Sequence, residues 1–329
     1  MIMEETNKLL DVLKERIGNP DLIEPIMICT ILTGRSADVL EFIERNNIHD
    51  YESKKQYVFF PKKSDTLSDI VVQKPIQHSE TRFSPLYLRG LSFSGDIPLS
   101  EYYSRLPAVI SIYQENGLSF TKPVTFFVGE NGVGKSTLIE AIAVAAGFNP
   151  EGGTLNFQFT TKETHSSLHN FVKLTRGVRR NTDGFFLRAE SFYNAASYLE
   201  DMAKWAPGQD LFAPYGGKSL HKQSHGESFM ALVENRFSGN GLFILDEPEA
   251  ALSPMKQLRL LALIHDLASE GAQFIISTHS PILMTLPDAD LIQFTEYGLE
   301  HLSYEETEHF KVASDFLRYP ERMLKEILA

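Results

Sequence analysis

Residues Val124–Thr137 read VTFFVGENGVGKST, and they carry the clearest structural signal in the chain. It opens with a largely apolar run without alternation, which is typical of a parallel strand covered on both faces. Glycines at positions 129 and 134, and the Lys-Ser pair after them, match the Walker A pattern of a phosphate-binding loop. The glycines let backbone N–H groups turn inward, and the helix that follows points its positive end at the same anion. We therefore predict that nucleotide phosphates bind at Gly129, Glu130, Asn131, Gly132, Val133, Gly134, Lys135, Ser136 and Thr137.

Two side chains of this loop carry the chemistry that a nucleoside triphosphate needs. In loops of this pattern the lysine, here Lys135, reaches the β- and γ-phosphates, and the hydroxyl of Ser136 is a ligand for Mg²⁺. A chance glycine turn is the alternative, but an apolar strand precedes the loop and a helical stretch follows it. The sequence predicts ATP and Mg²⁺ as the bound groups.

Apolar runs and helical stretches alternate through residues 81–329. Continuous apolar runs fit buried parallel strands, and the helices between them fit crossover connections. We predict an α/β fold for this part of the chain, with the parallel-sheet core of a P-loop NTPase. The predicted strands are 124–128, 241–245 and 272–277, and the predicted helices are 136–146, 228–237 and 254–269.

A pair of acids, Asp246 and Glu247, ends the second of these strands. Ligands bind at the carboxyl ends of the strands in open parallel sheets. Asp246 is predicted to hold Mg²⁺, directly or through water, and Glu247 to orient or deprotonate a water molecule beside the γ-phosphate. A solvated strand end before Pro248 is the alternative reading of the pair.

The composition excludes several classes of protein. The chain has 329 residues and a net charge of −12, so any contact with nucleic acid has to be a local basic patch. A single cysteine, Cys29, rules out an internal disulfide. No apolar stretch has the length of a membrane span, and the acidic N-terminus is unlike a signal peptide. We expect a cytoplasmic protein that is not embedded in a membrane.

Two further segments, SHGES at 224–228 and STHSP at 277–281, complete an ordered set of motifs with GENGVGKST and LFILDEPEAALS. This set resembles the ABC-type ATPases, in particular the branch outside the transporters that includes recombination and chromosome-maintenance ATPases. More narrowly, residues 85–329 look like small stand-alone bacterial ATPases of the "AAA family". The resemblance does not extend to residues 1–80.

The resemblance implies that two subunits sandwich two ATP molecules. It makes Ser224, His225, Gly226 and Glu227 the signature loop, which touches the γ-phosphate held by the other subunit. Transporters usually carry Gln where this chain has Glu227, and Gly where it has His225. A plain serine helix cap is the alternative for this segment.

Further roles follow from the same resemblance. Residues 249–253 correspond to the D-loop at the dimer seam, and His279 corresponds to the switch histidine that holds the γ-phosphate and the attacking water. Gln158 is a candidate contact for Mg²⁺ or water. The strand 86–93 is expected near the adenine or the α-phosphate, with Arg89 as a candidate contact.

Two other regions are expected to serve partners. Residues 1–80 are predicted to form a small α+β module. It is either winged-helix-like and contacts a protein, because acidic residues outnumber the basic ones that a DNA reader needs, or it is a small helical cap packed on the main domain. A helical lobe is expected at about 158–235. Its basic residues are predicted to share much of one helix face, as a nucleic-acid or partner contact or as a solvated face: Lys173, Arg176, Arg179 and Arg180.

The sequence thus predicts an Mg²⁺-dependent ATPase that forms a homodimer on binding ATP and couples its nucleotide state to a partner or nucleic acid, in DNA maintenance or defence. One alternative is an ATP-binding switch with little turnover. Another is the ATP-binding subunit of a transporter, against which Glu227 and the N-terminal module count.

Overall fold

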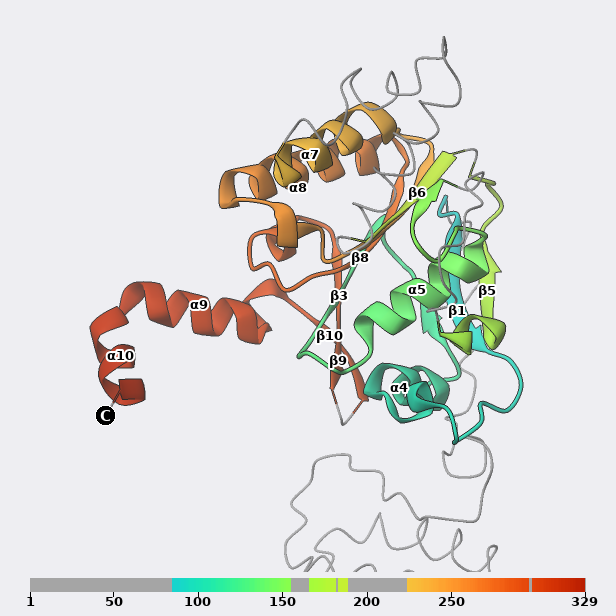
Figure 1. Cartoon of the computed structure of the whole chain (residues 1–329), viewed down its shortest axis with the longest axis horizontal. Coiled ribbons are helices and arrows are strands. Elements are labelled where there is room, and N and C mark those ends of the chain that lie inside the picture. The colour runs from blue at the N-terminus through green and yellow to red at the C-terminus, as the bar shows by residue number, and fades with distance from the viewer. Residues whose placement is uncertain (1–84, 155–165, 182, 189–223, 296–297, 329) are drawn as a thin grey trace, which may run out of the picture. The chain divides into compact units, whose positions relative to one another are not determined.

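The computed structural model describes residues 85–154, 166–181, 183–188, 224–295 and 298–328 (Figure 1). Contacts divide the chain into two units, Met1–Val71 and Val72–Ala329. The predicted module at 1–80 and the predicted contact at Gln158 lie outside the described residues. The same holds for the part of the expected lobe at 189–223.

A mixed, mostly parallel sheet forms the centre of the described residues, in the order β10-β9-β3-β8-β7-β6-β4. The five inner strands run parallel, while β10 and β4 pair antiparallel at the edges. This is the α/β fold of a P-loop NTPase, as predicted. The strands are β3 (Val124–Val128), β4 (Gly153–Thr154), β6 (Asp183–Arg188), β7 (Gly241–Asp246), β8 (Gln273–Ser277), β9 (Asp290–Thr295) and β10 (Gly298–Leu302).

Helices cover both faces of this sheet, which is why its inner strands β3, β7 and β8 are largely apolar on both sides. Along β7, Leu242 and Ile244 pack toward α5 (Lys135–Ala146) and α4 (Pro107–Gln114). Phe243 and Leu245 pack the other way, toward α7 (His225–Arg236) and α8 (Pro254–Glu270). A strand buried on two sides needs no polar alternation, so the unbroken apolar runs were a sound signal for it.

A second, smaller sheet pairs β1 (Leu88–Phe93) antiparallel with β2 (Leu118–Ser119) and with β5 (Val172–Arg176). One side chain of the main sheet bonds directly to it. The buried amide of Gln273 accepts from Leu88 N and donates to Leu88 O, both at 2.8 Å. The strand expected at 86–93 is therefore β1, and a single glutamine satisfies both backbone groups of its first residue.

The prediction that these four basic residues share a helix face is wrong. Lys173 and Arg176 lie on strand β5, where side chains alternate between two faces, and Arg179 and Arg180 follow in the loop after it. Arg179 is engaged locally: its guanidinium lies 5.2 Å from the ring centroid of Tyr87 and donates to Asn240. Between 166 and 188 the described part of the lobe holds a 3₁₀ turn, η4 (Ser167–Asn170), and two strands, but no α-helix.

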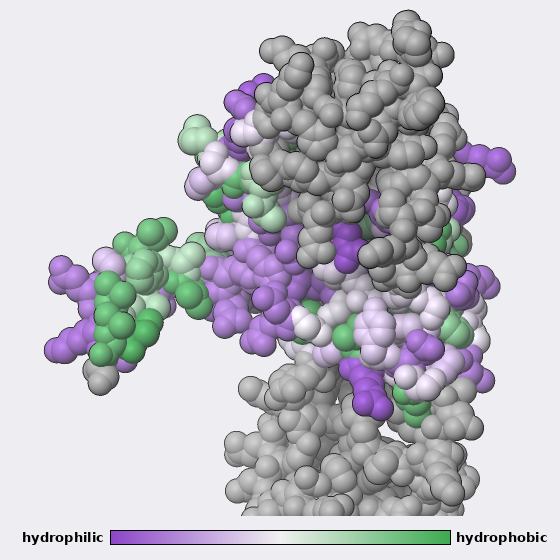
Figure 2. All heavy atoms as spheres, in the orientation of Figure 1, coloured by the Kyte–Doolittle hydropathy of each residue, from purple (hydrophilic) through white to green (hydrophobic). Residues whose placement is uncertain are grey.

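Short 3₁₀ turns join the remaining elements: η3 (Tyr102–Arg105), η7 (Pro248–Ala251), η8 (Leu283–Thr285) and η9 (Tyr304–Glu306). The chain ends in two helices, α9 (Glu308–Arg318) and α10 (Pro320–Leu328), neither of which buries a residue. Figure 2 shows hydrophobic side chains gathered on this segment. The large exposed ones are Val312, Phe316, Leu317, Tyr319, Leu324, Ile327 and Leu328. Among the described residues no helix is long and apolar enough to cross a membrane.

Candidate nucleotide-binding site

The loop between β3 and α5 has the backbone that its glycines make available. Gly129, Gly132 and Gly134 all have positive φ, at 129°, 86° and 100°. A Cβ on Gly134 would also lie 2.9 Å from the Cβ of Leu106, so both conformation and space require glycine there. No side chain of the described residues caps the start of α5, which leaves the first turn of the helix open to a ligand.

Lys135 is held inside the loop that it serves. Its Nζ donates to the carbonyl oxygens of Gly129, at 2.7 Å, and Glu130, at 2.8 Å, and the residue is 4% exposed. Burial lowers the pKa of the ammonium, while the nearby carboxylates of Glu247, Asp246 and Glu249 raise it. The loop and the acidic pair therefore act on each other electrostatically, although about 110 residues separate them in sequence.

Asp246 ends β7 as a buried carboxylate. Its Oδ1 accepts from the hydroxyl of Ser277, the last residue of β8, at 2.5 Å, and its Oδ2 lies 3.5 Å from Nε of Arg188, the last residue of β6. Arg188 also donates to Glu140 on α5 at 2.7 Å. The buried oxygens of Asp246 and the partly exposed Ser136 at the start of α5 are the hard donors that suit Mg²⁺.

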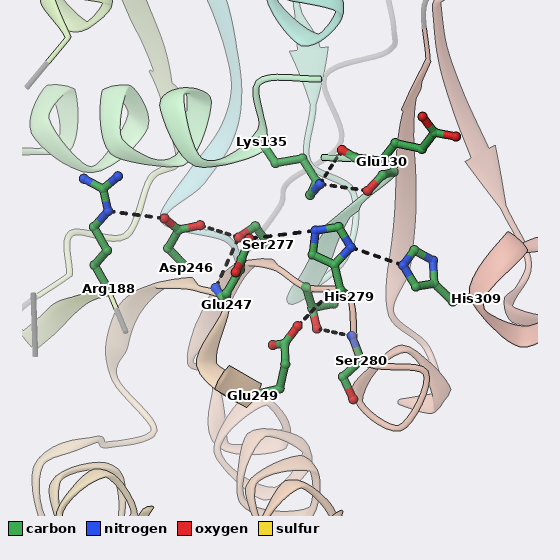
Figure 3. A network of polar contacts seen from close by, with 12 residues as sticks. Glu130, Lys135, Arg188, Asp246, Glu247, Glu249, Ser277, His279, Ser280 and His309 are labelled. Atoms are coloured by element: carbon green, nitrogen blue, oxygen red, sulfur yellow. Dashed lines mark hydrogen bonds and ion pairs between the residues drawn. The ribbon is translucent and has the colours of Figure 1, made fainter. Parts of the chain in front are cut away.

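Glu247 follows in a left-handed backbone conformation, with φ 49° and ψ 54°. Its N–H donates to the carbonyl oxygen of Ser277 at 3.1 Å and lies 3.3 Å from the hydroxyl of the same residue. The neighbouring strand thus holds both acids. The side chain of Glu247 points toward His279, with Oε1 of Glu247 3.8 Å from Nε2 of His279 (Figure 3).

His279 lies just past the end of β8, at the centre of this polar network (Figure 3). Its backbone N–H donates to Oε1 of Glu249, and its Nδ1 lies 3.2 Å from Nε2 of His309 on α9. Its own Nε2 is buried without a hydrogen-bond partner among the described residues. Burial, with Lys135 and His309 adding to it, lowers the pKa of His279 to about 4, so the ring is neutral at physiological pH.

The expected signature loop is a capped helix start. Glu227 accepts from both the backbone N–H of Ser224, at 2.9 Å, and its hydroxyl, at 2.6 Å. A Cβ on Gly226 would lie 2.7 Å from the carbonyl oxygen of Ala251, so this loop packs on residues 249–253, the expected D-loop. The structure describes no side chain for His225. The helix-cap alternative describes Ser224 within one chain, and a role toward a second chain stays a prediction.

The structure adds three residues to the predicted set, and it gives Glu249, expected in the D-loop, a contact within its own chain. Arg188 contacts Asp246, and Ser277 contacts both Asp246 and the backbone of Glu247. Glu249 accepts from the backbone N–H of His279, and His309 contacts the His279 ring. Ser277 and Glu249 lie inside motifs that the sequence already marks, so nearness along the chain was a usable signal for them. Arg188 and His309 reach the site only through the β6–β7 pairing and the placement of α9.

Two sequence models of protein families match parts of the chain. The one described as "AAA domain" matches residues 109–195, which include the phosphate loop. The one described as "AAA domain, putative AbiEii toxin, Type IV TA system" matches residues 228–285, which include Asp246, Glu247 and His279.

Two of the curated relatives are described as ATP-binding proteins. A "Putative ABC transporter ATP-binding protein" of Pyrococcus furiosus is 25% identical over 64% of this chain and 90% of its own length. The cytochrome c biogenesis ATP-binding export protein of Aliivibrio fischeri is 27% identical over 51% of this chain and 84% of its own length. Among solved structures, an ATP-binding cassette of an ABC transporter is 16% identical with a TM-score of 0.40, covering 70% of this chain and 95% of that one. The SMC head domain from Thermotoga maritima is 16% identical with a TM-score of 0.34, covering 66% and 99%.

Proposed function

We propose that this chain, an ATP-binding P-loop ATPase with ABC-type relatives, hydrolyses ATP with Mg²⁺ between two copies of itself. One observation carries the proposal. Lys135, Asp246, Glu247 and His279 come from three separate segments of the chain, yet they meet at the carboxyl ends of β3, β7 and β8 (Figure 3). A positive group for phosphate, an oxygen site for a metal, a carboxylate and a neutral imidazole are the parts that hydrolysis of a phosphoanhydride needs.

Binding falls to the loop and to its lysine. The N–H groups of residues 129–134 and of the uncapped first turn of α5 surround the phosphates, and Lys135 exchanges its loop carbonyls for phosphate oxygens. Ser136 and Asp246 would hold Mg²⁺, and the bound metal would neutralise charge that develops on the phosphates. Arg188 and Ser277 keep Asp246 aimed, since each contacts one of its two oxygens.

Glu247 and His279 act on the attacking water. Glu247 accepts the proton of a water that lies in line with the γ-phosphate. His279, neutral at physiological pH, donates from Nε2 to the γ-phosphate or to that water, since Nε2 has no partner among the described residues and lies 3.8 Å from Oε1 of Glu247. Opening and closing of the two copies then follows the presence of the γ-phosphate.

The second copy supplies the remaining contact. Ser224, at the positive end of α7, and the loop with Gly226 and Glu227 are proposed to contact the γ-phosphate held by the partner subunit. The opening and closing of the two copies is proposed to act on a partner. This partner is proposed to be a protein bound through residues 1–80, because a net charge of −12 does not favour nucleic acid. The coupling of ATP hydrolysis to this partner is part of the same proposal, and the proposed biological role is DNA maintenance or defence.

The test is the mass in solution of Glu247→Gln with and without Mg·ATP. This variant keeps the site and stops the water step, so we expect ATP to convert monomer to dimer and the dimer to persist. Ser224→Asn should keep the dimer, because its amide can donate both to Glu227 and to a phosphate oxygen, as the Ser224 hydroxyl can. Ser224→Asp should abolish it, because its carboxylate repels phosphate; a melting temperature close to wild type would show that its repulsion of Glu227 leaves the fold intact. An ATP-independent mass contradicts the sandwich, and turnover equal to wild type in Glu247→Gln removes Glu247 from its role and favours the ATP-binding switch.

A further inference from the structure

The contact between His279 and His309 joins the proposed site to the C-terminal helices. Nδ1 of His279 and Nε2 of His309 lie 3.2 Å apart, within hydrogen-bond distance (Figure 3). The pKa of His309, like that of His279, is lowered mainly by burial; Lys135 adds to this at both rings, and Glu308 opposes it at His309. Two neutral imidazoles can share this contact only if one nitrogen carries the proton and the other accepts.

The surroundings decide which nitrogen donates. If Nδ1 of His279 donated, its Nε2 would present a bare lone pair to Oε1 of Glu247 at 3.8 Å, and two electron-rich atoms would face each other. If Nε2 of His309 donates instead, the proton of His279 sits on its own Nε2 and points toward the carboxylate. The second arrangement replaces a repulsion by an attraction, and it also gives Nε2 a proton to offer to a phosphate oxygen.

His309 is held firmly enough to direct its neighbour. It is the second residue of α9, whose first turn is fixed by Thr307, a buried N-cap that accepts from Phe310 N at 3.2 Å. Ser303 and Glu306 cap the preceding turn η9, and Tyr304 packs edge-on against Phe310 at 4.8 Å between ring centroids. The caps fix where α9 begins, and they therefore also fix the position of the His309 ring beside His279.

We propose that His309 is a positioning residue for the ATPase reaction: by donating from Nε2 to Nδ1 of His279, it keeps the His279 proton on Nε2, facing Glu247 and the γ-phosphate site. This inference rests on the proposed function, because it assigns a partner to a residue of that site. It makes α9 a structural part of the site, although the rest of that helix buries no side chain.

The direct test is the tautomer of His279 in the full chain. With ¹⁵N-labelled histidine, we expect wild type to show a protonated Nε2 and a bare Nδ1 at His279, assigned by the loss of these signals in His279→Gln. His309→Phe, which removes the donor, should turn this into a mixture of tautomers. His309→Gln should restore it, because its amide nitrogen reaches about the same point. His265→Gln, at an exposed histidine on α8, is the control and should change nothing.

Steady-state ATPase kinetics give the second readout. His309→Phe should lower kcat by about tenfold or more, by analogy with metal-bound histidines, for which loss of the orienting partner costs about 10–100-fold. The KM for ATP should change little, because the phosphate loop is untouched, and His309→Gln should recover most of kcat. Melting temperatures close to wild type would show that all the variants fold.

The outcomes separate this inference from the proposed function. A His309→Phe chain that hydrolyses ATP at the wild-type rate, or that keeps the His279 proton on Nε2, overturns the inference and leaves the ATPase standing. A wild-type chain that fixes the tautomer but hydrolyses no ATP contradicts the proposed function itself, and the histidine pairing then has no reaction to serve.

Discussion

Glu247 combines a functional side chain with an unfavourable backbone. Residues other than glycine rarely occupy the left-handed region, which costs them roughly 1–2 kcal/mol. Here the N–H of Glu247 bonds back to Ser277, so the turn after β7 is set by the neighbouring strand and not by the preference of the residue. Strain of this kind persists where the surrounding structure over-determines it.

This strain is measurable with a matched pair of variants. Glu247→Gly and Glu247→Ala both remove the side chain, so only the backbone preference differs between them. We expect the glycine variant to be more stable by about 1 kcal/mol in urea unfolding, because glycine accepts positive φ without a penalty. Equal stabilities would mean that the turn relaxes once the side chain is gone.

The imidazole of His279 predicts a dependence of stability on pH. Its pKa is about 4 in the folded chain and about 6.5 when unfolded, so between these values the unfolded state binds a proton that the folded state does not. The free energy of unfolding should therefore fall as the pH drops from about 6.5 toward 4. Urea unfolding at about pH 7 and about pH 5 measures this, and His279→Gln should show a smaller fall than wild type. A fall of the same size in both chains would place the proton uptake elsewhere.

At the scale of elements, local patterns predicted whatever depends on local chemistry. The phosphate loop, the strands β3, β7 and β8, and the helices α5, α7 and α8 follow from glycine spacing, unbroken apolar runs and the helical stretches between them. Residues 172–176 were expected within a helical lobe, although their sequence VKLTR alternates apolar and polar as a strand does, with Val172 and Leu174 packed on the core. The expectation followed the resemblance where the period of two was the better guide.

The amide of Gln273 is expected to stabilise strand β1. Gln273→Met keeps the volume of the side chain but leaves Leu88 N and Leu88 O without their buried partner. Each such loss costs about 1–3 kcal/mol, so the variant should lose at least about 2 kcal/mol of unfolding free energy. Gln293→Met, the same change at a half-buried position on β9, is the control and should lose far less. Similar losses for the two would show that the amide of Gln273 does not hold β1.

Across the whole described chain, burial is divided sharply. Helices α5, α7 and α8 bury large side chains against the main sheet, while α9 and α10 bury none and expose an apolar surface. Arg188 and His309 show why such long-range features escape sequence reading. Arg188 comes beside Asp246 only because β6 pairs with β7, and His309 reaches the site only because α9 starts where it does.

Two phenylalanines test this division. Phe229 on α7 is fully buried, and Phe316 on α9 is 41% exposed. We expect Phe229→Ala to lose about 3–5 kcal/mol of unfolding free energy, and Phe316→Ala to stay within about 0.5 kcal/mol of wild type. Urea unfolding of both variants checks this, with Mg·ATP left out so that binding does not add to stability. A large loss for Phe316→Ala would show that the C-terminal helices pack more closely than their exposure indicates.

The lysine of the phosphate loop has one further consequence. Because Lys135 is already bound to the carbonyls of Gly129 and Glu130, its freedom of rotation is lost when the chain folds and not when a ligand arrives. That loss is up to about 2 kcal/mol for a lysine side chain. ATP therefore meets an ammonium group that is already in place, and binding exchanges one set of oxygen acceptors for another. The entropic cost of ordering this side chain therefore lowers the stability of the folded chain, and it does not reduce the affinity for nucleotide.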